Sequence, residues 1–390
     1  MKSLVISFQS LNGESAGGTG RISFYLAREL NNLGILDNLV VSSKGKNKTD
    51  FPCQPVSPIS KYYLYFLNKI LRPLGLPSYI QRCSEEFLFD SFCKNFITND
   101  ITILFSTNPY LKRTLRKAQR YGVKTIFFPG NPNENLINKI VNKEYQSMGY
   151  KGIDAYTYGR RLTFYNQSII HFDHIICSNN LILESFNDLV SVSKSFVQGY
   201  VPPRLNKNTH SSKAENSTLC FGYLAYSVPL KGLHYLLQAW AKAELSNAKL
   251  IIGGPVDKHY DRYIKTKFGH LKNVEFIGEV REIDHFFDLL DFFVSPSLID
   301  GEPVTVIESM QRCVPPIVTD GCGIKDFIKN GENGFVIPVA DVNALRDILT
   351  FIKNEPMMGE KLGVAASETF QETTFAEFIE RLTKKVVDLG

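Results

Sequence analysis

Short runs of β-branched and aromatic residues alternate along this chain with longer segments whose apolar residues recur at helical spacing. In the first half, strands are predicted at 4–8, 38–42, 101–105, 125–128 and 174–177, and an amphipathic helix at about 21–33. In the second half, strands are predicted at 219–223, 249–252, 274–277 and 292–296, and a long amphipathic helix at 374–389. This alternation is typical of parallel sheets with helices on their faces. The chain is therefore predicted to be an α/β protein.

Two domains are expected, because 390 residues exceed the about 250–300 that one hydrophobic core usually serves. Residues 204–218 form a polar segment between the two series of strands, and we interpret it as the linker. The predicted division is residues 1–203 for the first domain, 219–370 for the second, and 371–390 for a C-terminal helix.

Composition indicates an ordinary globular protein, with 44% hydrophobic and 21% charged residues. The seven cysteines are scattered and contain no C-x-x-C pair, which argues against a disulfide framework or a zinc site. A strand follows Met1 almost directly, in place of a signal peptide. A reducing cytoplasm is the expected location.

The net charge of +5 is unevenly distributed, with an excess of basic residues in the first half and of acidic residues in the second. Basic residues recur at helical spacing in the segment 112–124, and cations alternate with Tyr and Leu in 61–72. Such segments suit an anionic membrane surface on the inner face of the membrane. The alternative is two amphipathic helices with solvated outer faces. No nucleic-acid-binding module is recognisable, so nucleic acid is not an expected partner.

Two acids, Asp300 and Glu308, flank a loop and an apolar run. Pro303 suits the first turn of a helix, so a strand, a loop and a helix are predicted in this order. The helix start would offer backbone N–H groups near Val304 and Thr305 to an anion, while the carboxylates accept hydrogen bonds from ligand hydroxyls. A phosphate beside a polyol indicates a nucleotide sugar. The alternative is an ordinary loop acid and a solvated helix acid.

A known family shares this pattern. The stretch SPSLIDGEPVTVIESM resembles the E-x7-E signature of the family 4 retaining glycosyltransferases of GT-B fold, and the resemblance continues through NGENGFVIPVADVNAL. It implies two Rossmann-like domains facing a cleft, an acceptor-binding first domain, a nucleotide-sugar-binding second domain, and a C-terminal helix that crosses back to the first. The first acid of the signature is Asp300, where the family usually has Glu.

The resemblance also implies roles for single residues. Glu308 would hold the donor's ribose, Asp300 the transferred sugar, and Lys231 the diphosphate together with the helix-start amides at Val304 and Thr305. These three side chains are the candidate catalytic residues. The implied donor is a UDP-, GDP- or ADP-sugar, the implied acceptor a saccharide, a lipid-linked sugar or a protein, and no metal or other cofactor is required.

The family's G-R-x(n)-K-G motif is incomplete in this chain, because Tyr223 stands where arginine is usual. Arg281 is a candidate for the missing phosphate ligand, and backbone groups around Glu279 and Val280 are expected by resemblance to contact the base. An exposed Arg281 without a role is the alternative.

The loop GESAGGTG, with Gly17 and Gly18, separates the first strand from a helix, where glycines let amides approach a phosphate closely. By resemblance it lines the donor cleft. A dinucleotide site fits less well, because the third glycine and the acid after the second strand are absent, although Lys44 leaves NADP open. A structural turn is the third possibility.

The acceptor side lacks a histidine that related enzymes have, since Asn131, Pro132 and Asn133 occupy the corresponding segment. The function that these observations favour is a retaining glycosyltransferase, acting in bacterial surface polysaccharide or glycolipid synthesis. Two alternatives remain: a nucleotide-sugar 2-epimerase of similar fold, and a catalytically silent nucleotide-sugar-binding subunit.

Overall fold

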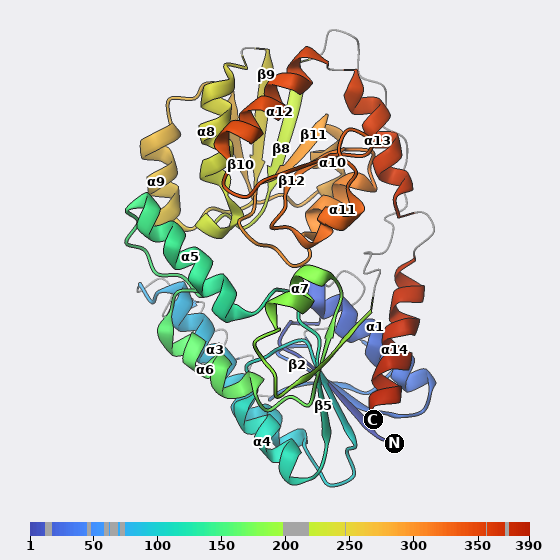
Figure 1. Cartoon of the computed structure of the whole chain (residues 1–390). Coiled ribbons are helices and arrows are strands. Elements are labelled where there is room, and N and C mark those ends of the chain that lie inside the picture. The colour runs from blue at the N-terminus through green and yellow to red at the C-terminus, as the bar shows by residue number, and fades with distance from the viewer. Residues whose placement is uncertain are drawn as a thin grey trace. The chain divides into compact units, whose positions relative to one another are not determined.

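The structure is a computed structural model of the whole chain (Figure 1). It describes residues 1–11, 18–44, 48–57, 62, 69–70, 75–197, 218–245, 247–355, 357–370 and 374–390. The chain divides into two compact units. Unit 1 consists of Met1–Asn138, Ile153–Tyr200 and Phe375–Gly390, and unit 2 of Lys139–Gly152 and Val201–Thr374. Most of the predicted linker lies outside the described residues.

Unit 1 contains a parallel sheet with the strand order β3-β2-β1-β4-β5-β6-β7. The central strands are short, continuous apolar runs, as expected where helices cover both faces. The strands are β1 (Ser3–Ser7), β2 (Leu36–Val41), β3 (Cys53–Pro55), β4 (Ile103–Ser106), β5 (Lys124–Phe127), β6 (His174–Cys177) and β7 (Ser193–Phe196).

The described helices of unit 1 cover this sheet. They are α1 (Gly18–Asn32), α3 (Ser78–Cys93), η3 (Lys94–Phe96), α4 (Lys112–Arg120), the start of α5 (Glu134–Met148), α6 (Gly159–Ile169), α7 (Asn180–Ser185) and α14 (Phe375–Leu389). The C-terminal helix α14 packs along α1, where the rings of Tyr25 and Phe375 meet edge to face with centroids 5.0 Å apart (Figure 1).

A buried carboxylate caps α4. Asp90 of α3 accepts hydrogen bonds from the backbone N–H groups of Arg113 and Thr114, each at 2.9 Å, and from the Thr114 hydroxyl at 2.8 Å. The first turn of a helix has N–H groups without intrahelical partners, and these bonds satisfy two of them. Asp90 therefore fixes the start of the basic helix α4 against α3.

Unit 2 contains a second parallel sheet, with the order β10-β9-β8-β11-β12-β13. Its strands are β8 (Leu219–Leu224), β9 (Ala248–Gly253), β10 (Val274–Gly278), β11 (Phe292–Ser295), β12 (Pro316–Thr319) and β13 (Phe335–Ile337). Its described helices include the later part of α5, η4 (Pro229–Lys231), α8 (Leu233–Ala243), α9 (Lys258–Phe268), α10 (Ile283–Asp288), α11 (Val304–Met310), η5 (Gly323–Phe327), α12 (Val342–Asn354) and α13 (Met358–Glu368).

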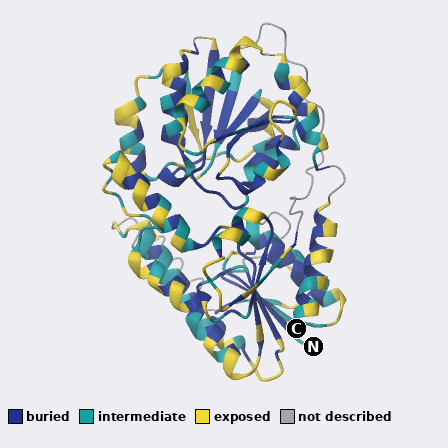
Figure 2. Ribbon diagram, viewed as in Figure 1, coloured by how far each residue is buried: buried dark blue, intermediate teal, exposed yellow. Residues whose placement is uncertain are grey.

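Each sheet has a buried apolar core beside it, and the central strands appear dark blue in Figure 2. In both sheets the strand order reverses next to the first strand of the unit, between β1 and β4 in unit 1 and between β8 and β11 in unit 2. Loops at the carboxyl ends of such strands diverge, and ligands of open α/β sheets bind in the crevice between them. These two places are where a site is expected within each unit.

Candidate functional site

The loops after β8 and β11 approach each other closely in unit 2. Gly232 follows η4 with φ of +68°, and a Cβ built on it would lie 1.8 Å from the carbonyl oxygen of Pro296. The Leu298 N–H donates to the Leu230 carbonyl at 2.9 Å. A side chain would not fit at Gly232, so glycine at this position lets the η4 turn lie directly against the loop that leaves β11.

This approach brings Lys231 and Asp300 together, although they are 69 positions apart in the sequence. Lys231 Nζ donates to Asp300 Oδ2 at 2.6 Å, and the Asp300 side chain is 9% exposed against 27% for Lys231. The Asp300 N–H donates to the Gly321 carbonyl and its own carbonyl accepts from the Gly323 N–H, both at 2.9 Å. Asp300 is therefore held between the loops after β11 and β12, with its carboxylate turned toward the ammonium.

Glu308 lies on α11, which begins at Val304, directly after Pro303. Glu308 is half-buried, and its carbonyl accepts from Arg312 Nη1 at 2.9 Å. Val304 and Thr305 are the first two residues of the helix, and its N-cap residue Pro303 provides no side-chain cap. Their N–H groups belong to the first turn, where no intrahelical acceptor exists, at the end of the loop that carries Asp300.

Val280 and Arg281 lie beyond β10, at the edge of the unit 2 sheet. Val280 packs near Gly253 at the end of β9, and Arg281 is exposed. Because β9 stands between β10 and β8, Arg281 and Lys231 follow strands that are not neighbours in the sheet. Its assignment as a phosphate ligand stays a prediction.

Tyr223, which replaces the arginine of the family motif, is a buried residue of β8. Its hydroxyl accepts from the Ser227 hydroxyl at 3.2 Å. Burial raises the pKa of Tyr223 to about 12, so the phenol stays protonated at neutral pH. It serves as a packing residue beneath the loop, and it adds no charge for a phosphate.

Of the two predicted glycines of the N-terminal loop, Gly17 lies outside the described residues. Gly18 is the first residue of α1, with φ of +51° and open space around a built Cβ. Both belong to unit 1, whereas the other candidate residues belong to unit 2.

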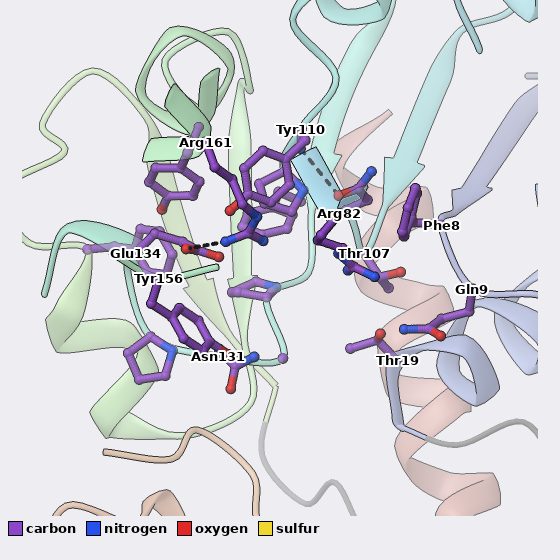
Figure 3. Close-up of a pocket in the computed structure, with 18 residues that line it drawn as sticks. Phe8, Gln9, Thr19, Arg82, Thr107, Tyr110, Asn131, Glu134, Tyr156 and Arg161 are labelled. Carbon is purple, nitrogen blue, oxygen red and sulfur yellow. Dashed lines mark hydrogen bonds and ion pairs between the residues drawn. The ribbon is translucent and has the colours of Figure 1, made fainter. Parts of the chain in front are cut away.

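Unit 1 has a cavity of about 170 Å³ at its own reversal of strand order (Figure 3). The loops after β1, β4 and β5 form part of its wall. Residues of α6 and of other elements of unit 1 complete the wall. Asn131 and Pro132, from the segment where a catalytic histidine was sought, line it. Other polar lining residues are Gln9, Thr19, Arg82, Thr107, Asn108, Glu134 and Arg161.

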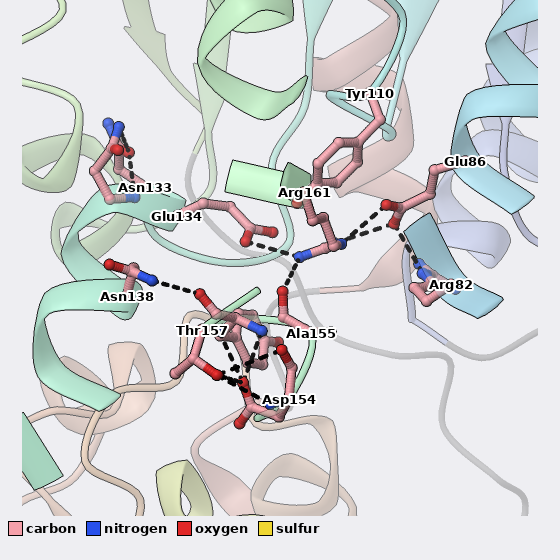
Figure 4. A network of polar contacts seen from close by, with 12 residues as sticks. Arg82, Glu86, Tyr110, Asn133, Glu134, Asn138, Asp154, Ala155, Thr157 and Arg161 are labelled. Atoms are coloured by element: carbon pink, nitrogen blue, oxygen red, sulfur yellow. Dashed lines mark hydrogen bonds and ion pairs between the residues drawn. The ribbon is translucent and has the colours of Figure 1, made fainter. Parts of the chain in front are cut away.

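A buried ionic network supports one side of this cavity (Figure 4). Arg161 Nε donates to Glu86 at 2.9 Å, its Nη1 donates to Glu134 at 2.9 Å, and its guanidinium stacks 4.2 Å from the centre of the Tyr110 ring. Burial alone would disfavour the cation, but the two carboxylates raise the pKa of Arg161 well above its ordinary value. The network fixes Glu134, Tyr110 and Arg161 relative to one another.

A second buried network in unit 2 was not foreseen from the sequence. The Tyr260 hydroxyl accepts from the His234 backbone N–H at 3.0 Å and lies 2.7 Å from His234 Nδ1. Because an ionised carboxylate can only accept, His234 Nε2–H donates to Glu144 at 2.9 Å. Tyr235 donates to the other oxygen of Glu144 at 2.9 Å. His234 and Tyr235 stand in the first turn of α8, only three and four positions after Lys231. The network therefore anchors the turn that presents the lysine.

Among the residues that the structure describes, no three His, Cys, Asp or Glu side chains are grouped in a way that could hold a metal ion. No helix in the described part of the chain combines the length and the apolar character needed to cross a bilayer.

Residues 206–369 match the family model of glycosyl transferases group 1. The chain is 28% identical over 155 residues to the putative glycosyltransferase EpsD of Bacillus subtilis (strain 168), a match covering 39% of this chain and 41% of that protein. It is 26% identical over 198 residues to the capsular polysaccharide biosynthesis glycosyltransferase CapM of Staphylococcus aureus, covering 49% of this chain and 52% of that protein. The matches thus span about half the length of these relatives.

Solved structures resemble the chain over its full length. Sucrose-phosphate synthase from Thermosynechococcus elongatus has a TM-score of 0.69 at 15% identity, covering 100% of this chain and 99% of that chain. Anabaena HepE in complex with UDP and glucose has a TM-score of 0.63 at 12% identity, covering 100% of both chains. At these identities the likeness shows the fold alone, and the prediction of two Rossmann-like units is confirmed.

Proposed function

We propose that the chain, whose residues 206–369 match the model of the glycosyl transferases group 1 family and which has the GT-B fold, is a glycosyltransferase. It would transfer a sugar from a nucleoside-diphosphate sugar to an acceptor hydroxyl with retention of anomeric configuration. The observation that carries the proposal is the Lys231–Asp300 pair. It stands where the strand order of unit 2 reverses, on the loop that leads into α11.

Lys231 is well suited to a departing diphosphate. Lys231 stands just before α8, where its neighbour Gly232 and the His234 network hold the backbone in place. Little reorganisation of the lysine is therefore needed when charge develops on the leaving group. The N–H groups of Val304 and Thr305 add donors for phosphate oxygens. In the proposed scheme the diphosphate leaves with the bonding pair of the sugar C1–O bond while the acceptor oxygen bonds to C1, and the proton of the acceptor hydroxyl passes to a phosphate oxygen of the departing diphosphate. No metal is required.

The carboxylates would orient the donor. Asp300, fixed on both sides by backbone hydrogen bonds, would accept from hydroxyls of the transferred sugar, and Glu308 from those of the ribose. Both assignments rest on the family signature together with the position of these residues around one loop. Val280 is assigned to the base, Arg281 to the diphosphate, and Gly17 and Gly18 to the donor cleft, on the signature alone.

The relatives favour a role in surface polysaccharide or glycolipid synthesis and a UDP-sugar donor, since CapM is named for capsular polysaccharide biosynthesis and HepE was solved with UDP and glucose. The acceptor would then be a saccharide or a lipid-linked sugar, bound by unit 1. A protein acceptor is the remaining alternative.

The test is a panel of UDP-, GDP- and ADP-sugars, read first by thermal shift and then by release of nucleoside diphosphate. One donor should stabilise the protein, and it should be consumed faster when an acceptor is added. Conversion of that donor into its 2-epimer without acceptor, followed by NMR, would show an epimerase. Binding without turnover over a broad acceptor panel would show a silent subunit. No stabilisation by any nucleotide sugar would refute the donor site.

A second observation favours contact with an anionic membrane. Two hollows beside α4, of about 740 and 550 Å³, share Arg113 and Arg116 and have cationic but no acidic side chains among the described residues that line them. Phe87 and Phe164 give the larger one apolar walls. Basic residues near an anionic leaflet add about 1 kcal/mol each. We therefore propose that unit 1 docks peripherally, on the cytoplasmic face, through Lys112, Arg113, Arg116, Lys117 and Arg120.

Aromatic residues before α3 were predicted to assist this docking. Tyr62 is 73% exposed, whereas Tyr63 and Tyr65 lie outside the described residues. Co-sedimentation with anionic and neutral vesicles tests the docking. The variant Arg116→Glu, Lys117→Glu, Arg120→Glu should lose binding to anionic vesicles. A matched variant on α9, Lys258→Glu, Arg262→Glu, Lys267→Glu, should keep it. Equal loss in both, or equal binding to neutral vesicles, would refute a specific basic surface.

A further inference from the structure

The cavity of unit 1 contains buried polar atoms that lack partners. Nδ2 of Asn108 and the hydroxyls of Tyr110 and Tyr165 form no hydrogen bond with any described residue, and these side chains are 5%, 2% and 1% exposed. All three line the cavity. A buried donor or acceptor without a partner costs about 1–3 kcal/mol, so three around one space indicate a ligand that satisfies them.

The cavity offers no unmatched charge. Its two guanidinium groups, on Arg82 and Arg161, pair with the carboxylates of Glu86 and Glu134, with Arg82 donating to Glu86 at 2.8 Å. Burial, with a further effect from Glu134, raises the pKa of both Tyr110 and Tyr165 well above the ordinary value, so both stay neutral hydroxyls. An anionic ligand would have to displace an internal carboxylate from its partner, whereas a neutral polyol can hydrogen-bond to the uncharged lining side chains and leave the ion pairs intact.

Size and wall chemistry narrow the ligand further. About 170 Å³ is less than the about 300–1,000 Å³ of pockets that hold drug-sized molecules, so the cavity has room for one ring. Its lining combines the aromatic rings of Phe8, Tyr110 and Tyr165 with the amides of Gln9, Asn108 and Asn131. Apolar faces with a few placed polar groups suit a pyranose, which has C–H faces and hydroxyl edges.

We propose that this cavity binds one uncharged sugar ring, the terminal unit of the acceptor, and that Asn108, Tyr110 and Tyr165 determine its specificity. The proposal rests on the proposed function and goes beyond it, since it assigns a class of acceptor to named residues. Asn108 Nδ2 donates to a ring hydroxyl, while the two phenols donate and accept. Acidic sugars and free phosphate are disfavoured, because neither arginine is available to them.

The test measures binding without turnover. Methyl glycosides of neutral hexoses and of N-acetylglucosamine are compared with the methyl glycoside of glucuronic acid, by saturation-transfer NMR on the full chain. At least one neutral glycoside should bind, and the glucuronide should bind at least about tenfold more weakly. Tyr165→Phe should weaken the neutral glycoside about 2- to 12-fold, the equivalent of one hydrogen bond. Tyr25→Phe, on α1 outside the cavity lining, should leave the affinity unchanged.

A stability readout separates ligand binding from a structural role. Tyr165→Phe removes an unpaired buried hydroxyl, so the Tm of the free protein should stay or rise while sugar affinity falls. A lower Tm with unchanged affinity would overturn the proposal, as would tight binding of the glucuronide or no binding of any neutral glycoside. UDP binding, measured in parallel, tests the donor site separately, so failure of the sugar site and failure of the proposed function are distinguishable.

Discussion

The close packing of Gly232 against Pro296 allows a quantitative test of how the donor site is assembled. An alanine at position 232 would be forced into the left-handed region, which costs an L-residue about 1–2 kcal/mol. Its Cβ would also lie 1.8 Å from a backbone oxygen, so the η4 turn would have to move away from the loop after β11. Forced repacking of this kind typically costs a further 1–3 kcal/mol or so. We expect Gly232→Ala to lower the free energy of unfolding by about 2–5 kcal/mol.

Gly331 supplies the matched control, because its φ is +75° and a built Cβ has open space around it. Gly331→Ala should cost only the backbone term, about 1–2 kcal/mol, or about 2–8 °C in Tm for a unit of this size. Calorimetric melts and UDP titrations of both variants and wild type measure the two effects. Gly232→Ala should lose UDP affinity, and Gly331→Ala should keep it. Equal loss of stability in the two variants, with UDP affinity intact, would show that the close approach does not position Lys231.

Three further predictions follow from the same site. Lys231→Ala should lower turnover about 10²- to 10³-fold, the usual effect of removing one preorganised donor, and wild-type turnover in the folded variant would exclude Lys231 from the mechanism. Glu308→Gln should weaken UDP binding by about 1.5–3 kcal/mol in calorimetry, and unchanged affinity would refute the ribose assignment. Burial works against the charge of Glu144, but the hydrogen bond from His234 lowers its pKa. Its contribution to stability is therefore complete above the unfolded value of about 4.3 and lost as pH falls through the folded value. The difference in unfolding free energy between wild type and Glu144→Gln, measured with urea, should be full at pH 7 and shrink as the pH falls below about 4.3, and a constant difference would contradict this.

The sequence predicts the central strands well, because they are continuous apolar runs. β6 lies at the predicted residues, and β8 and β11 differ by one residue at one end. The edge strands β3 and β7 were not predicted, and neither was the inner strand β12. An edge strand buries less of its surface, so Cys53–Pro55 and Ser193–Phe196 carry mixed polar and apolar residues with no clear period.

The candidate site was predictable one residue at a time, but its assembly was not. Lys231 and Asp300 each follow a predicted strand, yet only the order of strands makes β8 and β11 neighbours. The Glu144–His234 bond joins positions 90 apart, and a lone glutamate on an amphipathic helix carries no local signal of its partner. The unit 1 cavity likewise forms only where three loops and a helix come together in the folded structure. The pattern of hydrophobic and polar residues along the chain does not predict this arrangement.

Each unit is built from chain segments that are distant in the sequence, so a single cut between the two series of strands does not separate the units. A fragment ending near residue 203 would lack α14, so the apolar faces of Phe375 and Phe378 would be missing from α1 and from Phe128. The complementary fragment would lack Glu144, leaving the buried His234 Nε2–H and the Tyr235 hydroxyl without their acceptor. The two fragments should therefore fold poorly when each is expressed alone, and better when the two are co-expressed.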